Sequence, residues 1–298
     1  MTINDAHCHF FSPGFFDALA RQRGGDERGA DLCRVLGWDD PESPEALADR
    51  WVRELDAHGV ERAALISSVP GDEESVAVAA ARHPDRCVGL CMLDPTADGA
   101  ARRASHALTA RGLRGLCLFP AMHGFDLGGR EVRTVVEAAA ARPGSVVFVH
   151  CGMLSVGVRA RLGLPSRFDI RRGQPLDLLP LAQAFPDVPF LVPHFGAGLL
   201  REALLLADAC PNVYLDTSSS NRWMTYTPGL TLEGVFRAAA AVAGPERLVF
   251  GTDSSFFPRG WQRGVLDAQR EAMTAAGLDD DARAAVLGGT FDRLFPLG

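Results

Sequence analysis

The sequence predicts an α/β fold, a (β/α)8 TIM barrel, from two observations. About eight short apolar runs alternate with amphipathic stretches along 298 residues. The apolar runs are continuous rather than alternating, which is typical of parallel strands buried on both faces. Eight such units in a chain of this length favour a closed barrel. We therefore expect one domain, residues 1–298, with long loops after the first, fifth and seventh strands.

The expected elements follow in strict alternation. Strands are expected at 3–7, 62–69, 87–93, 113–119, 146–150, 190–194, 213–216 and 247–251. Helices are expected at 48–58, 73–83, 99–111, 130–142, 178–185, 199–210, 232–243 and 262–276. Turn residues such as Gly59, Gly112 and Gly244 mark the helix ends. A doubly wound open sheet is the alternative, but it usually carries a glycine-rich phosphate loop after its first strand, and residues 5–10 are not one.

Three connections are longer than the rest, at residues 10–47, 151–177 and 217–231. Each follows the carboxyl end of an expected strand. Barrel enzymes build their sites at that face, so we expect these loops to surround the functional residues.

Composition excludes several classes of function. All 30 basic residues are arginine, so a Schiff base, a pyridoxal phosphate anchor, a Walker lysine and a carbamylated lysine bridging two metals are ruled out. The net charge of −7 argues against a nucleic-acid partner, because phosphate binding needs a basic surface.

The compartment is expected to be the cytoplasm. No apolar run approaches the roughly 20 residues that span a bilayer, and no signal-like segment opens the sequence. The seven cysteines are scattered without a CxxC motif, which favours a reducing environment.

Five potential metal ligands lie at the carboxyl ends of expected strands: His7, His9, His150, His194 and Asp253. His7 and His9 are two residues apart, so both imidazoles point to the same side of an extended strand. A single strand-end histidine is usually structural. A closed barrel, however, brings all its strand ends to one rim, and three histidines with one aspartate match an open catalytic site for one divalent ion.

Recognition groups are expected on the long loops. Arg222 and Trp223, after the seventh strand, offer a guanidinium and an aromatic face to a planar carboxylate. Arg167, Arg171, Arg172 and Arg259 are alternatives, and the sequence does not choose among them. His123, after the fourth strand, is a further substrate-binding candidate. Each of these side chains also has a simpler interpretation as a solvated loop residue.

The ordered set of motifs resembles the amidohydrolase superfamily, and within it the amidohydrolase-2 branch that includes aminocarboxymuconate semialdehyde decarboxylase. The resemblance covers nearly the whole chain. The matching motifs are Asp5-Ala-His7-Cys-His9, Gly112-Leu-Arg114, His150-Cys-Gly152, His194-Phe-Gly196, Asp216-Thr-Ser218 and Gly251-Thr-Asp253.

The resemblance implies that His7, His9, His150 and Asp253 bind the metal, while His194 contacts the metal-bound water or the substrate. Asp253 is expected to act as ligand and as proton acceptor, so His194 and Asp253 are the expected catalytic pair. The absence of lysine predicts a site for one ion, unless a Glu or Cys from elsewhere in the chain replaces the bridging lysine. Zn²⁺ is the expected ion, and Mn²⁺ is the alternative. The resemblance also implies a homodimer.

The expected function is that of a mononuclear metal-dependent hydrolase, which activates a metal-bound water against a small carboxylate-bearing lactone, amide or ester. The alternative is a metal-dependent nonoxidative decarboxylase, a carbon–carbon lyase, acting on a small planar aromatic or muconate-type acid. A third reading, an inactive metal-binding barrel, is disfavoured because every expected ligand type is present.

Overall fold

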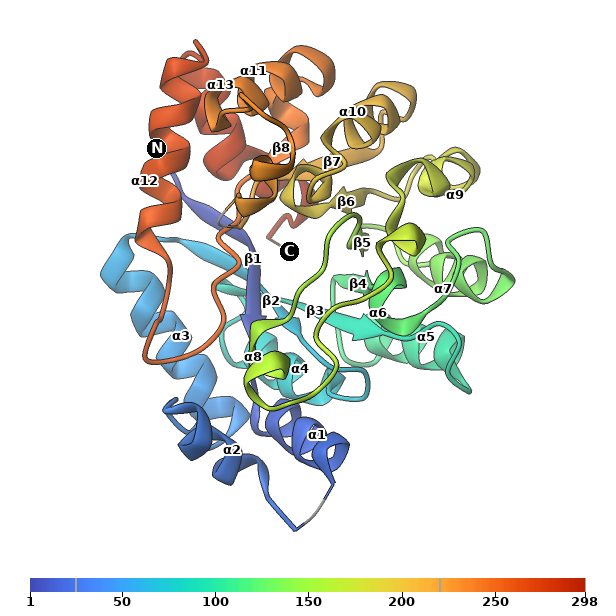
Figure 1. The fold of residues 1–298 in the computed structure, drawn as a ribbon, viewed down its shortest axis with the longest axis vertical. Coiled ribbons are helices and arrows are strands. Elements are labelled where there is room, and N and C mark those ends of the chain that lie inside the picture. Colours follow the sequence, from blue (N-terminus) through green and yellow to red (C-terminus); the bar gives the residue numbers. More distant parts are fainter. Residues whose placement is uncertain (25, 220, 298) are drawn as a thin grey trace.

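Eight parallel strands in chain order form one sheet in the computed structural model (Figure 1), which describes residues 1–24, 26–219 and 221–297. Residues 25, 220 and 298, which belong to the expected domain and to two of its expected loops, lie outside the described residues. The strands are β1 Asn4–Phe10, β2 Arg62–Ser67, β3 Cys87–Leu93, β4 Gly115–Leu118, β5 Val146–Val149, β6 Phe190–Val192, β7 Val213–Asp216 and β8 Leu248–Val249. This arrangement confirms the predicted barrel.

The sheet closes between its first and last strands, although β8 itself is only two residues long. Beyond β8 the chain continues beside β1. Ala6 N donates to the carbonyl of Phe250 at 2.8 Å, Asp253 N to that of His7 at 2.9 Å, and His9 N to that of Ser254 at 2.7 Å. These bonds form the seam of the barrel, and they place Asp253 directly beside the two histidines of β1.

Helices alternate with the strands and cover the outside of the barrel (Figure 1). They are α3 Pro44–His58, α4 Glu73–Arg82, α5 Ala100–Thr109, α7 Arg130–Ala140, α9 Leu179–Ala184, α10 Leu200–Ala209, α11 Leu232–Ala243 and α12 Arg263–Ala275, followed by α13 Asp280–Ala284 and α14 Thr290–Leu294. Helix α3 shows why these segments are helical. Ser43 caps its start by accepting from Ala46 N, Pro44 fits its first turn, and Gly59 ends it at φ 67°. None of the helices that the structure describes is long and apolar enough to cross a membrane.

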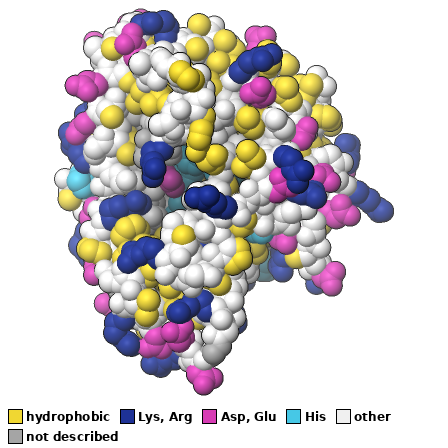
Figure 2. Space-filling model, in the orientation of Figure 1, with side chains coloured by type: hydrophobic (Ala, Val, Ile, Leu, Met, Phe, Trp, Pro, Cys, Tyr) yellow, Lys and Arg dark blue, Asp and Glu magenta, His cyan; other side chains and the backbone are white. Residues whose placement is uncertain are grey.

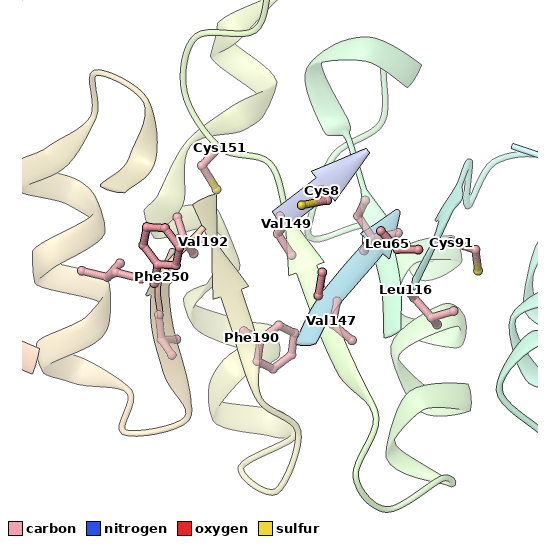
Figure 3. Close-up of a cluster of buried hydrophobic side chains, with 14 of the residues drawn as sticks. Cys8, Leu65, Cys91, Leu116, Val147, Val149, Cys151, Phe190, Val192 and Phe250 are labelled. Carbon is pink, nitrogen blue, oxygen red and sulfur yellow. The ribbon is translucent and has the colours of Figure 1, made fainter. Parts of the chain in front are cut away.

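Side chains of the strands fill two separate cores. Phe148, Leu90 and Val249 point into the barrel with other fully buried residues. The alternate positions face the surrounding helices, as Figure 3 shows for Val147 and Val149. Burial on both faces explains why the strands are continuous apolar runs in the sequence.

The carboxyl end of the barrel carries additional short helices. Helices α1 Pro13–Arg23 and α2 Gly29–Leu36 follow β1, α6 Pro120–His123 follows β4, and α8 Gly157–Arg161 follows β5. A third apolar cluster, which includes Phe16, Leu32, Val158 and Leu162, joins α1 and α2 to α8. Figure 1 shows these three helices grouped beside the strand ends. The loops after β1 and β5 therefore support each other over one side of the rim.

Candidate metal centre

Three ligand side chains converge at the seam of the barrel: His7 and His9 from β1, and Asp253 from the segment after β8. Their ligand atoms all lie within 4.8 Å of one another. The Nε2 atoms of His7 and His9 are 3.3 Å apart, and Asp253 Oδ1 lies 3.2 Å from His9 Nε2 and 3.8 Å from His7 Nε2. The alternation of a strand places both imidazoles on the same side, as the sequence predicts.

The hydrogen bonds of His7 fix which of its nitrogens faces His9 and Asp253. His7 Nδ1 donates to Asp216 Oδ2 at 2.6 Å, and both residues are fully buried. Burial lowers the pKa of His7, but the charge and hydrogen bond of Asp216 outweigh it, and the net pKa is raised. Asp216 therefore makes the imidazole more basic and leaves its Nε2 lone pair directed toward His9 and Asp253.

Ser68, just after β2, fixes which nitrogen of His9 carries the proton. Its Oγ donates to the Ile66 carbonyl at 3.1 Å, so it accepts from His9 Nδ1 at 2.8 Å. In the neutral imidazole the second nitrogen is then without a proton. The lone pair of His9 Nε2 points to the same place as that of His7.

The donor set fits one divalent cation. Three proton-free atoms at 3.2 to 3.8 Å repel one another unless a positive charge lies between them. Ligands at about 2.0–2.1 Å from a tetrahedral Zn²⁺ are themselves roughly 3.3 Å apart. Imidazole nitrogens and a carboxylate oxygen at this spacing are therefore a suitable partial shell, with room for further ligands.

Asp253 is held in the form that binds a cation. Burial raises the pKa of its carboxyl, but the adjacent imidazoles of His9 and His7 outweigh burial, and the net pKa falls well below its usual range. Its backbone has φ 60°, a conformation that costs free energy in a residue other than glycine. The bonds of the seam maintain this conformation and aim the carboxylate at the histidines.

His194 stands next to the three ligands rather than among them. It follows β6 in a short turn, with φ 56°, and its ring stacks on His7 at 5.1 Å between centroids. Its Nδ1 lies 3.2 Å from the Ser218 carbonyl and 2.9 Å from Ser218 Oγ. Burial lowers the pKa of His194. The neutral ring donates through Nδ1 to the carbonyl, so Nε2 is left as a base.

His150 lies directly after β5, beside His194. Their ring centroids are 5.2 Å apart, and the other neighbouring ring, that of Phe119, lies at 5.3 Å. Burial, together with the charge of His194, lowers the pKa of His150 well below its ordinary value. Among the described residues its buried Nδ1 has no hydrogen-bond partner. His150 is not within the group of three ligand atoms at 4.8 Å, so its role as a ligand stays a prediction.

The substrate-binding candidates lie farther out. His123 ends α6 and faces the charges of Asp94 and Arg159, and burial lowers its pKa. Arg222 is exposed in the turn after β7, whereas Trp223 is 6% exposed and packs in the outer core. In the part of the chain that the structure describes, no hydrogen bond, ion pair or ring contact joins these three to the metal ligands.

The sequence analysis did not predict three residues that bond to the candidate histidines: Asp216, Ser68 and Ser218. Asp216 ends an apolar strand, which is the signal that identified Asp253. Ser68 carried no such signal, because a serine after a strand commonly serves only as a turn residue, and Ser218 stood out only as part of the Asp216-Thr-Ser218 motif. Their importance depends on contacts that only the folded barrel creates.

Figure 2 shows a hollow on one face of the molecule. Histidine and acidic side chains are visible within it, and basic side chains, all of which are arginine, surround it. The side chain of Asp253 is 37% exposed, against 1% for His7. The candidate metal centre is therefore open to solvent on the side of Asp253.

Solved structures with the same fold come from several bacteria. A 5-carboxyvanillate decarboxylase from Novosphingobium aromaticivorans, complexed with manganese and a nitrobenzoic acid, is 16% identical with a TM-score of 0.66 over 99% of this chain and 96% of that one. A probable 2-pyrone-4,6-dicarboxylic acid hydrolase from Acinetobacter baumannii with citric acid bound is 14% identical, with a TM-score of 0.62 over 99% of each chain. An amidohydrolase from Burkholderia multivorans with bound zinc is 19% identical, with a TM-score of 0.60 over the whole of both chains.

A search among curated proteins finds no match. A family model described as amidohydrolase matches residues 5–297, which include every candidate ligand and all strand residues except Asn4. The chain therefore belongs to the amidohydrolase family.

Proposed function

We propose that the protein is a mononuclear metal-dependent hydrolase acting on a small lactone, amide or ester that carries a carboxylate. The observation that carries this proposal is the convergence of His7 Nε2, His9 Nε2 and Asp253 Oδ1 within 4.8 Å. His150 is the proposed fourth protein ligand. A divalent ion bound here supplies a water whose pKa is lowered from about 15.7 toward about 7.

The chain's own residues perform the proton transfers. His194 Nε2 accepts a proton from the attacking water, because Nδ1 is committed to Ser218. After the hydroxyl group has added to the substrate, its remaining proton passes to the second carboxylate oxygen of Asp253 and from there to the leaving group, while the first proton stays on His194. The stacked ring of His7 limits how far the His194 ring can rotate. Ser218 therefore acts as a positioning residue, and His194 and Asp253 are the proposed catalytic residues.

Zn²⁺ is the proposed ion, since two imidazoles and a carboxylate are ligands it commonly takes in catalytic sites. Mn²⁺ is the alternative, because it accepts the same nitrogen and oxygen donors. The solved structures of similar fold contain either metal. Metal analysis of the purified protein, followed by reconstitution with each ion separately, distinguishes the two.

Decarboxylation is a second candidate. The manganese-containing decarboxylase aligns with 99% of the chain, as fully as the hydrolase does. In that reaction His194 would deliver a proton to the substrate carbon instead of removing one from water. The same ligands serve both reactions, so the substrate decides between them.

The test is a paired assay of the metal-loaded protein. Carboxylate-bearing lactones, amides and esters are screened for acid release, and hydroxybenzoates and muconate-type acids are screened for CO₂ release. We expect hydrolysis that disappears on chelation and returns with metal. CO₂ release without hydrolysis would replace the first proposal with the second. A protein that binds no divalent ion on reconstitution would contradict both.

The proposed partner is a small-molecule substrate, and we propose a cytoplasmic homodimer. Light scattering of the purified protein tests the dimer, and localisation of the tagged chain in cells tests the compartment. A net charge of −7 supports the expectation that nucleic acid is not a partner.

A further inference from the structure

Arg259 differs from the other arginines near the rim in how it is held. Its Nη2 donates to Ser255 Oγ at 2.7 Å and to the Asp253 carbonyl at 3.3 Å. Its guanidinium carbon lies 4.5 Å from the centroid of the Phe256 ring. Phe256 is itself stacked on Trp38 at 3.8 Å, with 9° between the planes. An arginine tethered at one nitrogen and supported by a ring loses little freedom when it binds a ligand.

The charge of Arg259 is not neutralised by a neighbouring carboxylate. Arg171 and Arg172, also near the rim, form ion pairs with Asp169 and Asp126. Among the described residues Arg259 has no such ion pair, and no bond involves its Nε or Nη1. These two nitrogens are the donors left for a ligand, and each can donate to one oxygen of a carboxylate through a charge-assisted hydrogen bond.

Arg259 also lies close to the metal centre. It bonds to the backbone of Asp253, a proposed ligand. Burial is the largest cause of the lowered pKa of His9, and the positive charge of Arg259 lowers that pKa further. From His9 a row of aromatic rings leads back toward Arg259: Phe11 lies 5.9 Å from His9 and 6.1 Å from Trp38. Aromatic surface and the guanidinium of Arg259 therefore border the same side of the proposed metal centre.

We propose that Arg259 is the carboxylate-binding residue of the substrate site, and that Phe256 positions it. The inference rests on the proposed function and specifies the substrate: a small acid whose carboxylate binds Arg259 while its scissile group lies at the metal. A carboxylate bound to Arg259 anchors the substrate and is not the group that reacts. A substrate for decarboxylation at the same site would therefore need a second carboxylate.

Binding measurements test the proposal without requiring turnover. Benzoate and its neutral analogue benzamide are titrated into zinc-loaded protein and followed by ligand-observed NMR. We expect wild-type protein to prefer benzoate, and Arg259→Gln to lose roughly 10- to 100-fold in benzoate affinity, as expected for one charge-assisted contact. Its benzamide affinity and zinc content should stay unchanged. Phe256→Leu should lower benzoate affinity by a smaller factor, because the ring only supports the guanidinium.

Two other variants complete the experiment. Arg133→Gln is the matched control, since Arg133 also lies over an aromatic ring, 5.1 Å from Phe185, but on a helix outside the barrel. It should bind like wild type. Equal benzoate affinity in Arg259→Gln and wild type, a loss confined to Arg222→Gln, or no preference for benzoate in wild type would each overturn the proposal. A protein that needs Arg259 for benzoate but hydrolyses no compound of the panel would leave this inference standing while the proposed hydrolase function fails.

Discussion

At the residue scale, the contacts of the two Nδ1 atoms decide how the imidazoles of β1 behave. Asp216 accepts from one and Ser68 from the other, at 2.6 and 2.8 Å. Each contact commits a proton to Nδ1 and leaves Nε2 open. The difference lies in charge, because only Asp216 carries a negative charge that raises the basicity of its histidine.

We therefore predict that Asp216→Asn weakens metal binding. The amide keeps an oxygen that can accept from His7 Nδ1, but the negative charge is lost, and the loss of such a partner typically costs about 10- to 100-fold in metal affinity. Competition with a chromophoric chelator measures the zinc dissociation constant. Ser68→Ala, which removes a neutral acceptor, should have the smaller effect. An unchanged constant in Asp216→Asn would contradict this account.

A second prediction separates the base from the ligands. His194→Ala should retain its metal and lose about 10²- to 10⁴-fold in activity, the usual contribution of one general base. His9→Ala should lose the metal, because it removes one of the three convergent atoms. Elemental analysis of both variants checks the division. A metal-free His194 variant would show that this residue is itself a ligand.

His150 provides a third prediction at this scale. If it completes the ligand shell, then His150→Ala should bind metal more weakly than wild type. Phe119→Leu, a change in the ring beside it, should leave metal content unchanged. If His150→Ala binds metal with wild-type affinity, His150 is not a ligand. The ligands would then be His7, His9, Asp253 and solvent.

The convergence of three candidate ligands could be predicted from the sequence, and their binding of a metal stays a prediction. His7 and His9 were predictable from strand alternation, and Asp253 from its place after an apolar run. Asp216, Ser68 and Ser218 were not, because their roles depend on neighbours 209, 59 and 24 positions away along the chain. Arg259 was one of several rim arginines, and its tether to Ser255 and its place over the Phe256 ring distinguish it.

At the scale of elements, the strands were predictable but their ends were not. The first strand was expected at 3–7, and it runs through Phe10 because Ser254 bonds to His9 and keeps it extended. The last was expected at 247–251, but only two residues form a regular ladder. A strand ends where its partner ends, and the partner is not visible in local sequence.

The loop after β1 is attached to the barrel by a buried carboxylate. Asp72, before α4, accepts from Ser12 Oγ and Ser75 Oγ, each at 2.5 Å, and Ser12 also caps α1. A Cβ at Gly14 would lie 2.3 Å from the Asp72 carboxylate, so only glycine permits this approach. Burial raises the pKa of Asp72, although the two hydroxyl groups oppose the shift. The ionised form is therefore less favourable in the folded protein than in the unfolded chain.

This shift predicts a pH dependence that Asp72→Asn should remove. Because the folded pKa is the higher one, the folded state binds more protons between the unfolded value of 3.8 and the folded pKa. The free energy of unfolding contributed by Asp72 falls as pH rises through that window and is constant above it. Urea unfolding of both proteins from pH 4 to 7 should show Asp72→Asn gaining stability relative to wild type. A gain in the opposite direction would contradict the sign of the shift.

At the scale of the whole molecule, the proposed metal centre and the closure of the barrel are at the same place. His7 and His9 belong to β1, and Asp253 to the segment after β8, where regular pairing is shortest. Asp5 strengthens this seam by accepting from Trp261 Nε1 at 2.7 Å and Thr252 Oγ1 at 2.5 Å. A cation bound by both sides adds a direct link between the first strand and the last.

Removing the metal should therefore loosen the seam more than the rest of the barrel. Binding at a thousandfold excess over the dissociation constant stabilises the folded state by about 4 kcal/mol. We expect faster hydrogen exchange at Ala6, His9 and Asp253 after chelation, while Leu118, in the interior of the sheet, changes less. In His9→Ala the exchange of the other seam amides should not respond to metal. Equal acceleration throughout the sheet would indicate global destabilisation, and no acceleration at the seam would show that the backbone bonds alone close the barrel.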